Sequence, residues 1–275
     1  MCIESLMSAR QQRVGHICLF SKSVLPNTLH MKLSILCTIF TLSVSSLLAQ
    51  KTVATDEQAW FAVLNQTRIS KKWGFWFDAH LRLKDNYAGH LSQSILRFGP
   101  TYFLTDDVRL TAGYAYVHTF PGPGDANIGL SEHRLWQQVQ WFTRGPKARL
   151  MQRVRLEERY RRKTMNDNEL GEGYNFNWRI RYNFALFLPI TKKRFEPGGL
   201  LFLVNDEMFI NFGKNIVYNH FDQNRFFVGL VYQINKHAQL HGGYMNLYQQ
   251  LPSGNQFRNQ HTVRVFYFHN FDLRA

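Results

Sequence analysis

The stretch YNFNWRIRYNFALFLPI, residues 174–190, alternates between two kinds of side chain. Every even-numbered residue from Tyr174 to Leu188 is apolar or aromatic, whereas the odd-numbered residues begin with Asn175, Asn177 and Arg179. Because successive side chains of a strand point to opposite faces, the pattern predicts a strand with one apolar and one strongly polar face. Such a strand suits a soluble sheet with its apolar face in a core, or a membrane barrel with its apolar face against lipid.

Strand-like segments follow one another from residue 59 onward, and several of them show the same alternation. The predicted strands are residues 59–69, 73–84, 91–104, 108–120, 131–143, 148–162, 174–188, 200–213, 224–235, 237–249 and 257–273. Strands of soluble proteins average about 5 or 6 residues, while a tilted strand that crosses a bilayer needs roughly 9 to 11. The length of these segments therefore favours the membrane barrel, although Gln152, Glu158 and Asp206 fall on the apolar faces of their strands.

The predicted fold class is all-β, a single antiparallel up-and-down transmembrane β-barrel of about 10 to 12 strands. Short connections alternate with longer ones, such as residues 163–173, as they do between the two rims of outer-membrane barrels. The count of 11 conflicts with the even number expected of a bacterial single-chain barrel. We therefore expect either a further strand near residues 216–221 or a terminal strand that lies outside the wall.

The N-terminal part of the chain carries an export pattern. Residues 31–49 join a short positive region to an apolar run and a small residue, which predicts a secretory signal peptide. Residues 1–30 precede this second methionine and are interpreted as a mis-assigned extension, which leaves residues 50–275 as the barrel. All three cysteines precede Gln50, so residues 50–275 have no thiol chemistry. The formal net charge of residues 50–275 is +11, compared with +14 for the full chain.

Four short motifs carry a resemblance to a known family. They are EHRLWQQ at residues 132–138, RVRLEERY at 153–160, NDEMFIN at 205–211 and NRFFVGLVYQIN at 224–235. With these motifs the chain resembles the uncharacterised bacterial outer-membrane barrel proteins grouped as domain of unknown function twenty-four ninety. The resemblance covers nearly all of residues 50–275 and implies an export signal and an outer-membrane barrel, but no activity.

Arginine dominates the faces predicted to point inward. Arginine stays charged, so an inward guanidinium must meet a carboxylate, water or an anionic ligand. Two interpretations stay open: an arginine–glutamate ladder that fills a narrow lumen, or a passage for small anions. The candidate lumen-facing residues are Glu132, Arg134, Arg153, Arg155, Glu157, Arg159, Arg179, Arg181 and Glu207.

Other kinds of chemistry find little support in the sequence. Glu157 and Glu158 are neighbours in a strand and point to opposite faces, so they do not form an acid–base pair. The histidines are scattered without the spacing of metal ligands, and no nucleophile elbow is present. We predict no catalytic residue, metal or cofactor, and no nucleic-acid partner for an exported protein.

The expected role is that of an exported outer-membrane barrel in structure, transport or interaction, in contact with outer-membrane lipid and small anionic solutes. The alternatives are a narrow anion-preferring pore, a barrel enzyme acting on membrane lipid or lipopolysaccharide, and a soluble periplasmic β-protein.

Overall fold

The computed structural model describes residues 51–122 and 127–274, which form strands and their connections. The strands are β1 (Thr52–Arg68), β2 (Trp73–Lys84), β3 (His90–Phe103), β4 (Val108–Thr119), β5 (Leu130–Arg144), β6 (Arg149–Asn166), β7 (Glu169–Pro189), β8 (Leu200–Phe212), β9 (Phe221–Gln233), β10 (Ala238–Gln250) and β11 (Gln256–Asp272). This part of the chain contains no helix that is long and apolar enough to cross a membrane. The predicted extension (1–30) and signal peptide (31–49) lie outside the described residues.

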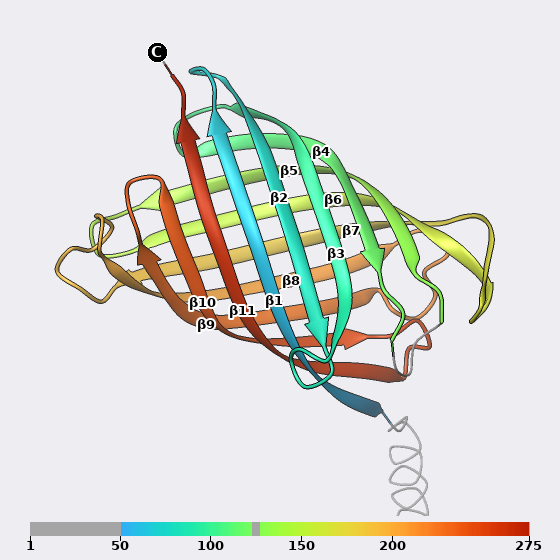
Figure 1. Cartoon of the computed structure of the whole chain (residues 1–275). Coiled ribbons are helices and arrows are strands. Elements are labelled where there is room, and N and C mark those ends of the chain that lie inside the picture. The colour runs from blue at the N-terminus through green and yellow to red at the C-terminus, as the bar shows by residue number, and fades with distance from the viewer. Residues whose placement is uncertain (1–50, 123–126, 275) are drawn as a thin grey trace, which may run out of the picture. The chain divides into compact units, whose positions relative to one another are not determined.

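The strands close into one barrel in which neighbours in the chain are neighbours in the wall, as Figure 1 shows. All pairings between successive strands are antiparallel, and the closing pair of β1 with β11 is parallel. An odd number of alternating strands requires this, because the first and last then run in the same direction. The mostly antiparallel up-and-down barrel is confirmed. The expected even strand number is wrong, since residues 213–220 form a loop and both terminal strands belong to the wall.

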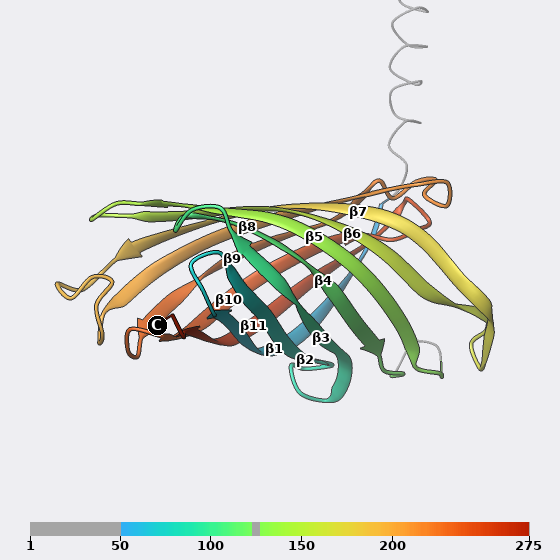
Figure 2. The same cartoon turned by 90° about the horizontal axis from the view of Figure 1, so that it is seen from above.

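Two regions of strand pairing extend further than the alternation predicted. β1 begins at Thr52, because its polar first part pairs with β11 before pairing with β2 starts at Ala59. β6 and β7 continue past their neighbours into a hairpin that turns at Asp167 and Asn168, where the sequence predicted a longer loop. Figure 2 shows this yellow hairpin projecting beyond the other strands. In both regions a partner strand supplies backbone hydrogen bonds that the local side-chain pattern does not reveal.

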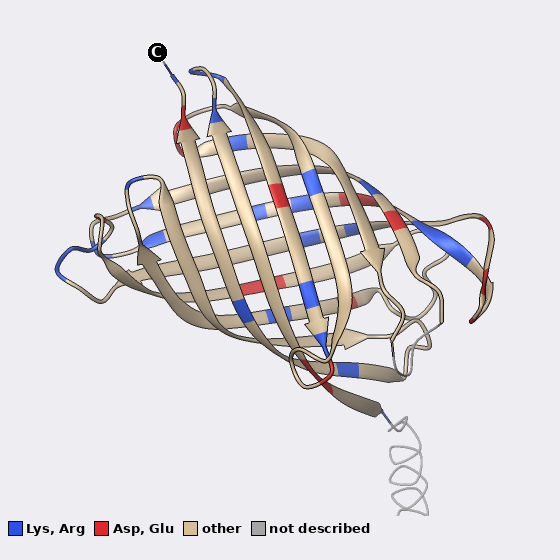
Figure 3. Cartoon of the chain, in the orientation of Figure 1, with Lys and Arg blue, Asp and Glu red and all other residues tan. Residues whose placement is uncertain are grey.

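Side-chain direction follows the predicted alternation. In β2, Phe75 and Phe77 are exposed on the outer surface, while Asp78 is fully buried inside the barrel. In β7, Ile180 is exposed and Arg181 is buried. Figure 3 accordingly shows charged positions in the middle of the strands as well as in the connections. The wall therefore presents an apolar outer surface and a charged interior, the reverse of a soluble sandwich.

The barrel has two different rims. The connections after β1, β3, β5, β7 and β9 lie at one rim, called here the short-turn rim, and those after β2, β4, β6, β8 and β10 lie at the long-loop rim. The connection after β7, residues 190–199, is the long member of the short-turn rim. β1 starts at the long-loop rim and β11 ends at the short-turn rim, as Figure 1 shows.

Apolar side chains share the interior with the charged ones. Trp136, Phe227 and Met245 are almost completely buried and belong to one cluster inside the wall. A Cβ atom built on Gly229 or Gly243 would lie 2.5 or 3.0 Å from the Phe227 ring. These two glycines thus leave the room in which the Phe227 ring packs against the wall.

Candidate functional site

The nine residues predicted to face the lumen all lie on the inward faces of β5, β6, β7 and β8. The inner wall of these strands carries Glu132 and Arg134 on β5, Arg153, Arg155, Glu157 and Arg159 on β6, Arg179 and Arg181 on β7, and Glu207 on β8. Eight of them line a common cavity, and Glu157 is buried against the arginines beside it. Alternation places them together because antiparallel register sets their inward positions side by side.

Glu157 holds two arginines of the adjacent strand. Arg179 donates through Nε and Nη2 to Glu157 Oε2 at 2.8 and 2.5 Å. Arg181 donates through Nη1 to Glu157 Oε1 at 2.7 Å. Both oxygens of this buried carboxylate are therefore engaged by charged donors, which form the stronger class of protein hydrogen bond.

Two further carboxylates extend the network across β8 and β9. Glu207 Oε1 accepts from Arg153 Nη2 and from Arg181 Nη2, each at 2.7 Å. Asp222 Oδ2 accepts from Arg179 Nη1 at 2.8 Å. The sequence prediction missed Asp222, because it began this strand at residue 224, whereas β9 begins at Phe221. A register irregularity between Phe209 and Ile210 brings both Asp222 and its neighbour Gln223 into the interior.

Glu132 closes the network towards the long-loop rim. It accepts bidentate bonds from Arg134, with Nε and Nη2 at 2.7 and 3.0 Å, and from Arg159, with Nε and Nη2 at 2.5 and 3.1 Å. We call the whole network the arginine ladder, which comprises Glu132, Arg134, Arg153, Glu157, Arg159, Arg179, Arg181, Glu207 and Asp222. In it each carboxylate carries at least one guanidinium, so most of the positive charge is compensated locally.

A second set of inward arginines has a different kind of support, and the sequence prediction did not select it. The set comprises Arg82, Arg109, Arg225 and Arg264, and we call it the aromatic-backed arginines. The Arg264 guanidinium lies 3.5 Å from the Phe227 ring centroid and that of Arg82 lies 3.6 Å from Trp60. Arg225 lies 4.4 Å from Phe209, and Arg109 lies 5.0 Å from Phe142.

These four arginines have neutral hydrogen-bond partners or none. Arg82 donates to Gln93 at 2.7 Å and Arg109 donates to Gln140 at 2.9 Å. The Nε atoms of Arg82, Arg225 and Arg264 are buried and have no hydrogen-bond partner among the described residues. No carboxylate of residues 51–122 or 127–274 forms an ion pair with any of the four. Their charge therefore remains directed at the lumen, held over aromatic rings. In the sequence, Arg82 and Arg225 could have been found from the alternation of their strands, which places both on the polar, inward face.

A third group of charges fixes the inner face of β2. Asp78 accepts from Arg97 Nε at 2.8 Å and from Trp76 Nε1 at 2.5 Å, and its carboxylate lies 2.9 Å from His80 Nε2. With Arg97 and Trp76 donating to it, this buried carboxylate is a structural acceptor.

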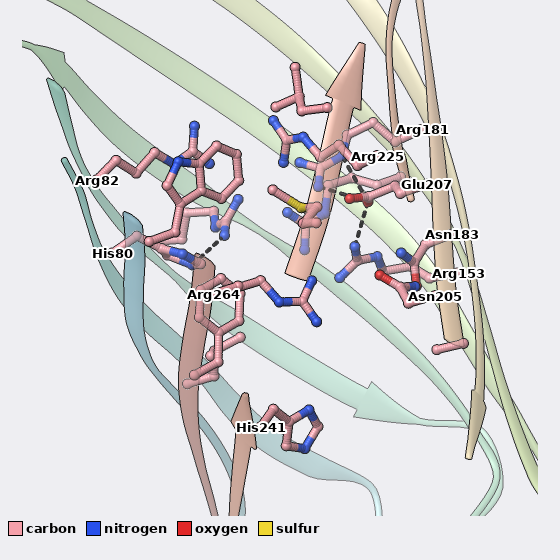
Figure 4. Close-up of a pocket in the computed structure, with 18 of the residues that line it drawn as sticks. His80, Arg82, Arg153, Arg181, Asn183, Asn205, Glu207, Arg225, His241 and Arg264 are labelled. Atoms are coloured by element: carbon pink, nitrogen blue, oxygen red, sulfur yellow. Dashed lines mark hydrogen bonds and ion pairs between the residues drawn. The ribbon is translucent and has the colours of Figure 1, made fainter. Parts of the chain in front are cut away.

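The inward side chains enclose a cavity of about 1040 Å³. Its lining reaches Lys84 and Thr119 near the long-loop rim and Arg144 and Lys236 near the short-turn rim. Among the described residues that line it, 17 are Lys or Arg and five are Asp or Glu. Figure 4 shows Arg82, Arg264 and Arg225 approaching the same space from different strands. The arrangement can bind anions, because cationic donors outnumber acidic ones around one enclosed volume.

The outward carboxylates stand apart from this chemistry. Glu158 faces outward and accepts from Gln137 Nε2 at 3.5 Å, and Asp206 accepts from Asn224 Nδ2 at 2.8 Å. In the described ranges no group of three His, Cys, Asp or Glu side chains is arranged to hold a metal ion.

Comparisons with known proteins agree with the resemblance of the four motifs. A family model described as a protein of unknown function, DUF2490, matches residues 57–258. No curated protein and no solved structure gives a significant match.

Proposed function

The chain belongs to the DUF2490 family of proteins of unknown function, and we propose that it is an exported outer-membrane β-barrel whose lumen preferentially admits small anions. One observation carries the proposal: a strongly cationic cavity lies inside the barrel and is lined by residues from both rims. In pores, rings of charged side chains select ions of the opposite sign.

The outer surface supports a membrane location. Large apolar side chains such as Leu81, Leu96 and Leu230 are exposed along the wall. Aromatic pairs lie towards the rims, with Trp73 against Tyr102 at one end and Trp178 against Phe212 at the other. Apolar bands flanked by aromatic residues are typical of barrels in lipid. Strands of 12 to 21 residues are long enough for this role.

The aromatic-backed arginines support anion preference more strongly than the ladder does. A guanidinium bound to a carboxylate presents little net charge to a passing ion, whereas one held over an aromatic ring keeps its positive potential. Arg225 and Arg264 both stand in the middle of their strands and face the cavity. An anion in the lumen therefore meets, midway along its path, cations that form no direct ion pair with a carboxylate of the described residues.

The test is ion conduction by the exported protein, purified from the outer-membrane fraction and placed in a planar bilayer under a KCl gradient. We expect discrete current steps and a reversal potential whose sign shows that chloride permeates more readily than potassium. The double variant Arg225→Gln/Arg264→Gln should keep the steps and lose most of the preference. Arg162→Gln removes an arginine of the outer face and serves as the matched control.

A heat-dependent gel shift shows in each case that the barrel is folded. A preference for cations, or the absence of conductance from a folded barrel, would refute the anion-preferring pore.

A further inference from the structure

One part of the cavity lining is apolar and is not explained by the passage of hydrated ions. Towards the short-turn rim the apolar inward positions, which share this end of the lining with polar ones such as Arg149 and Gln239, are Leu64 on β1, Ala185 and Phe187 on β7, Leu201 and Leu203 on β8, and Phe268 on β11. Phe187 is paired with Leu203, and Phe268 with Leu64, across neighbouring strands. These side chains therefore form an apolar surface within the lumen, in which the His241 ring contacts Phe268 and lies near Phe187, with ring centroids 4.2 and 6.1 Å apart.

This apolar surface is accessible from the cavity through its two phenylalanines, whereas Leu201 and Leu203 beneath them are buried. Phe187 and Phe268 are only partly buried, although they pack against the interior cluster. An apolar wall that faces water costs free energy in proportion to its area, and an apolar ligand group removes that cost. Binding pockets of about 300 to 1,000 Å³ are commonly lined by apolar side chains with a few placed polar groups.

The apolar surface adjoins the aromatic-backed arginines. Along the inward face of β11 the order is Arg264, Phe266 and Phe268, so charge gives way to aromatic side chains within four residues. At the strand rise this step from Arg264 to Phe268 spans about 13 Å, the length of a medium hydrocarbon chain. On β8 the same boundary falls between Leu203 and Glu207.

We propose that the cavity binds an amphiphilic anion, with one carboxylate head and an unbranched hydrocarbon tail. Arg225 and Arg264 hold the head, and the partly buried rings of Phe187 and Phe268, packed on the apolar cluster, receive the tail. The inference deepens the proposed function and rests on it in one respect: anions must be able to enter the lumen.

The experiment measures binding to the exported full-chain protein in lipid nanodiscs, with empty nanodiscs as background. The probes are sodium dodecanoate, dodecan-1-ol, which has the same tail without charge, and sodium acetate, which has the same head without a tail. We expect saturable binding of dodecanoate with one site per barrel, and much weaker binding of the other two probes.

Two variants separate head from tail. Arg225→Gln/Arg264→Gln removes charged donors and should weaken dodecanoate binding about 10-fold or more. Phe268→Gln should weaken dodecanoate binding while chloride conduction stays as in the unchanged protein, and Arg162→Gln on the outer face should change neither. A gel shift on heating confirms folding of each variant.

The outcomes distinguish this inference from the pore. Chloride-selective conduction together with dodecanoate binding no tighter than that of acetate overturns the amphiphile site and leaves the pore standing. Equal binding of dodecanol and dodecanoate also overturns it, because the arginines then contribute nothing. Saturable dodecanoate binding without chloride conduction supports the amphiphile site and overturns the pore.

Discussion

The interior of the barrel supports arginine in two ways, and the comparison shows what each can contribute. In the arginine ladder, Arg179 and Arg181 share the carboxylate of Glu157 at hydrogen-bond distance. On the opposite side of the lumen, Arg264 and Arg82 lie over the rings of Phe227 and Trp60. The first arrangement cancels charge to hold strands together, and the second keeps the charge available to a ligand.

The difference separates stability from selectivity. Removing one partner of a buried ion pair leaves an uncompensated charge, which is far more costly than never having had the pair. Removing a guanidinium from an aromatic ring leaves only a neutral surface. Substitutions in the ladder should therefore act on folding, and substitutions among the aromatic-backed arginines should act on ions.

The largest expected effect is that of Glu157→Gln. The substitution leaves Arg179 and Arg181 buried with less negative charge, which should lower the free energy of unfolding by about 3 to 5 kcal/mol. Urea unfolding of the barrel in lipid vesicles measures it. Glu158→Gln, one residue away on the outer face, is the matched control and should cost almost nothing. A loss at Glu157 no larger than at Glu158 would mean that the ladder does not stabilise the wall.

Gly243→Ala should disturb the packing of the Phe227 ring that supports Arg264. The new Cβ atom would lie 2.3 Å from the Val228 carbonyl oxygen and 3.0 Å from the Phe227 ring. The strand or the ring must shift, at a cost of about 1 to 3 kcal/mol, and the platform beneath Arg264 shifts with it. Gly242→Ala offers the control, since a Cβ there meets nothing within 4 Å. The same urea titration compares the two, and equal midpoints would show that Phe227 does not depend on this space.

Arg264→Gln should change ion preference more than stability. Stacking on Phe227 accounts for about 0.5 to 2 kcal/mol, so the barrel should still fold, while the reversal potential moves towards zero. Arg264→Lys keeps the charge and should preserve most of the preference. If glutamine and lysine gave the same reversal potential, the charge at this position would not act on ions.

The smallest effect should come from salt alone. The Debye length falls from about 10 Å at 0.1 M to 3 Å at 1 M, so high salt should reduce the anion preference set by water-exposed cations. The buried ladder should be almost insensitive, and the urea midpoint should change little. Conductance and urea unfolding measured at both salt concentrations test this contrast. A urea midpoint that fell as steeply as the anion preference would mean that the arginine ladder is exposed to water.

Sequence alternation predicted the wall and one side of the interior. The inward parity of Arg179 and Glu157 followed from a period of two, which antiparallel pairing then brought into register. Asp222 was missed because the predicted strand began at residue 224, and β9 begins earlier, next to an irregularity that interrupts the period of two. The start of β1 was missed because its pairing with β11 joins segments about 200 residues apart, and local pattern carries no information about such a partner.

The aromatic-backed arginines could not be selected from the sequence for a related reason. Arg264 meets a ring on β9, two strands away, and this contact depends on the curvature of the closed wall. Parity states that a side chain points inward, but it does not state which inward side chain of a nearby strand it meets. The division between arginines with and without a carboxylate partner is therefore a property of the closed barrel.

The parallel joint between β1 and β11 has a consequence for the two ends of the polypeptide. A barrel with an even strand count returns the chain to the compartment where its first strand began. Here the chain enters the wall at the long-loop rim with Thr52 and leaves it at the short-turn rim after Asp272. In a membrane the two ends thus emerge in different compartments, so an impermeant label applied to intact cells would reach one end and spare the other.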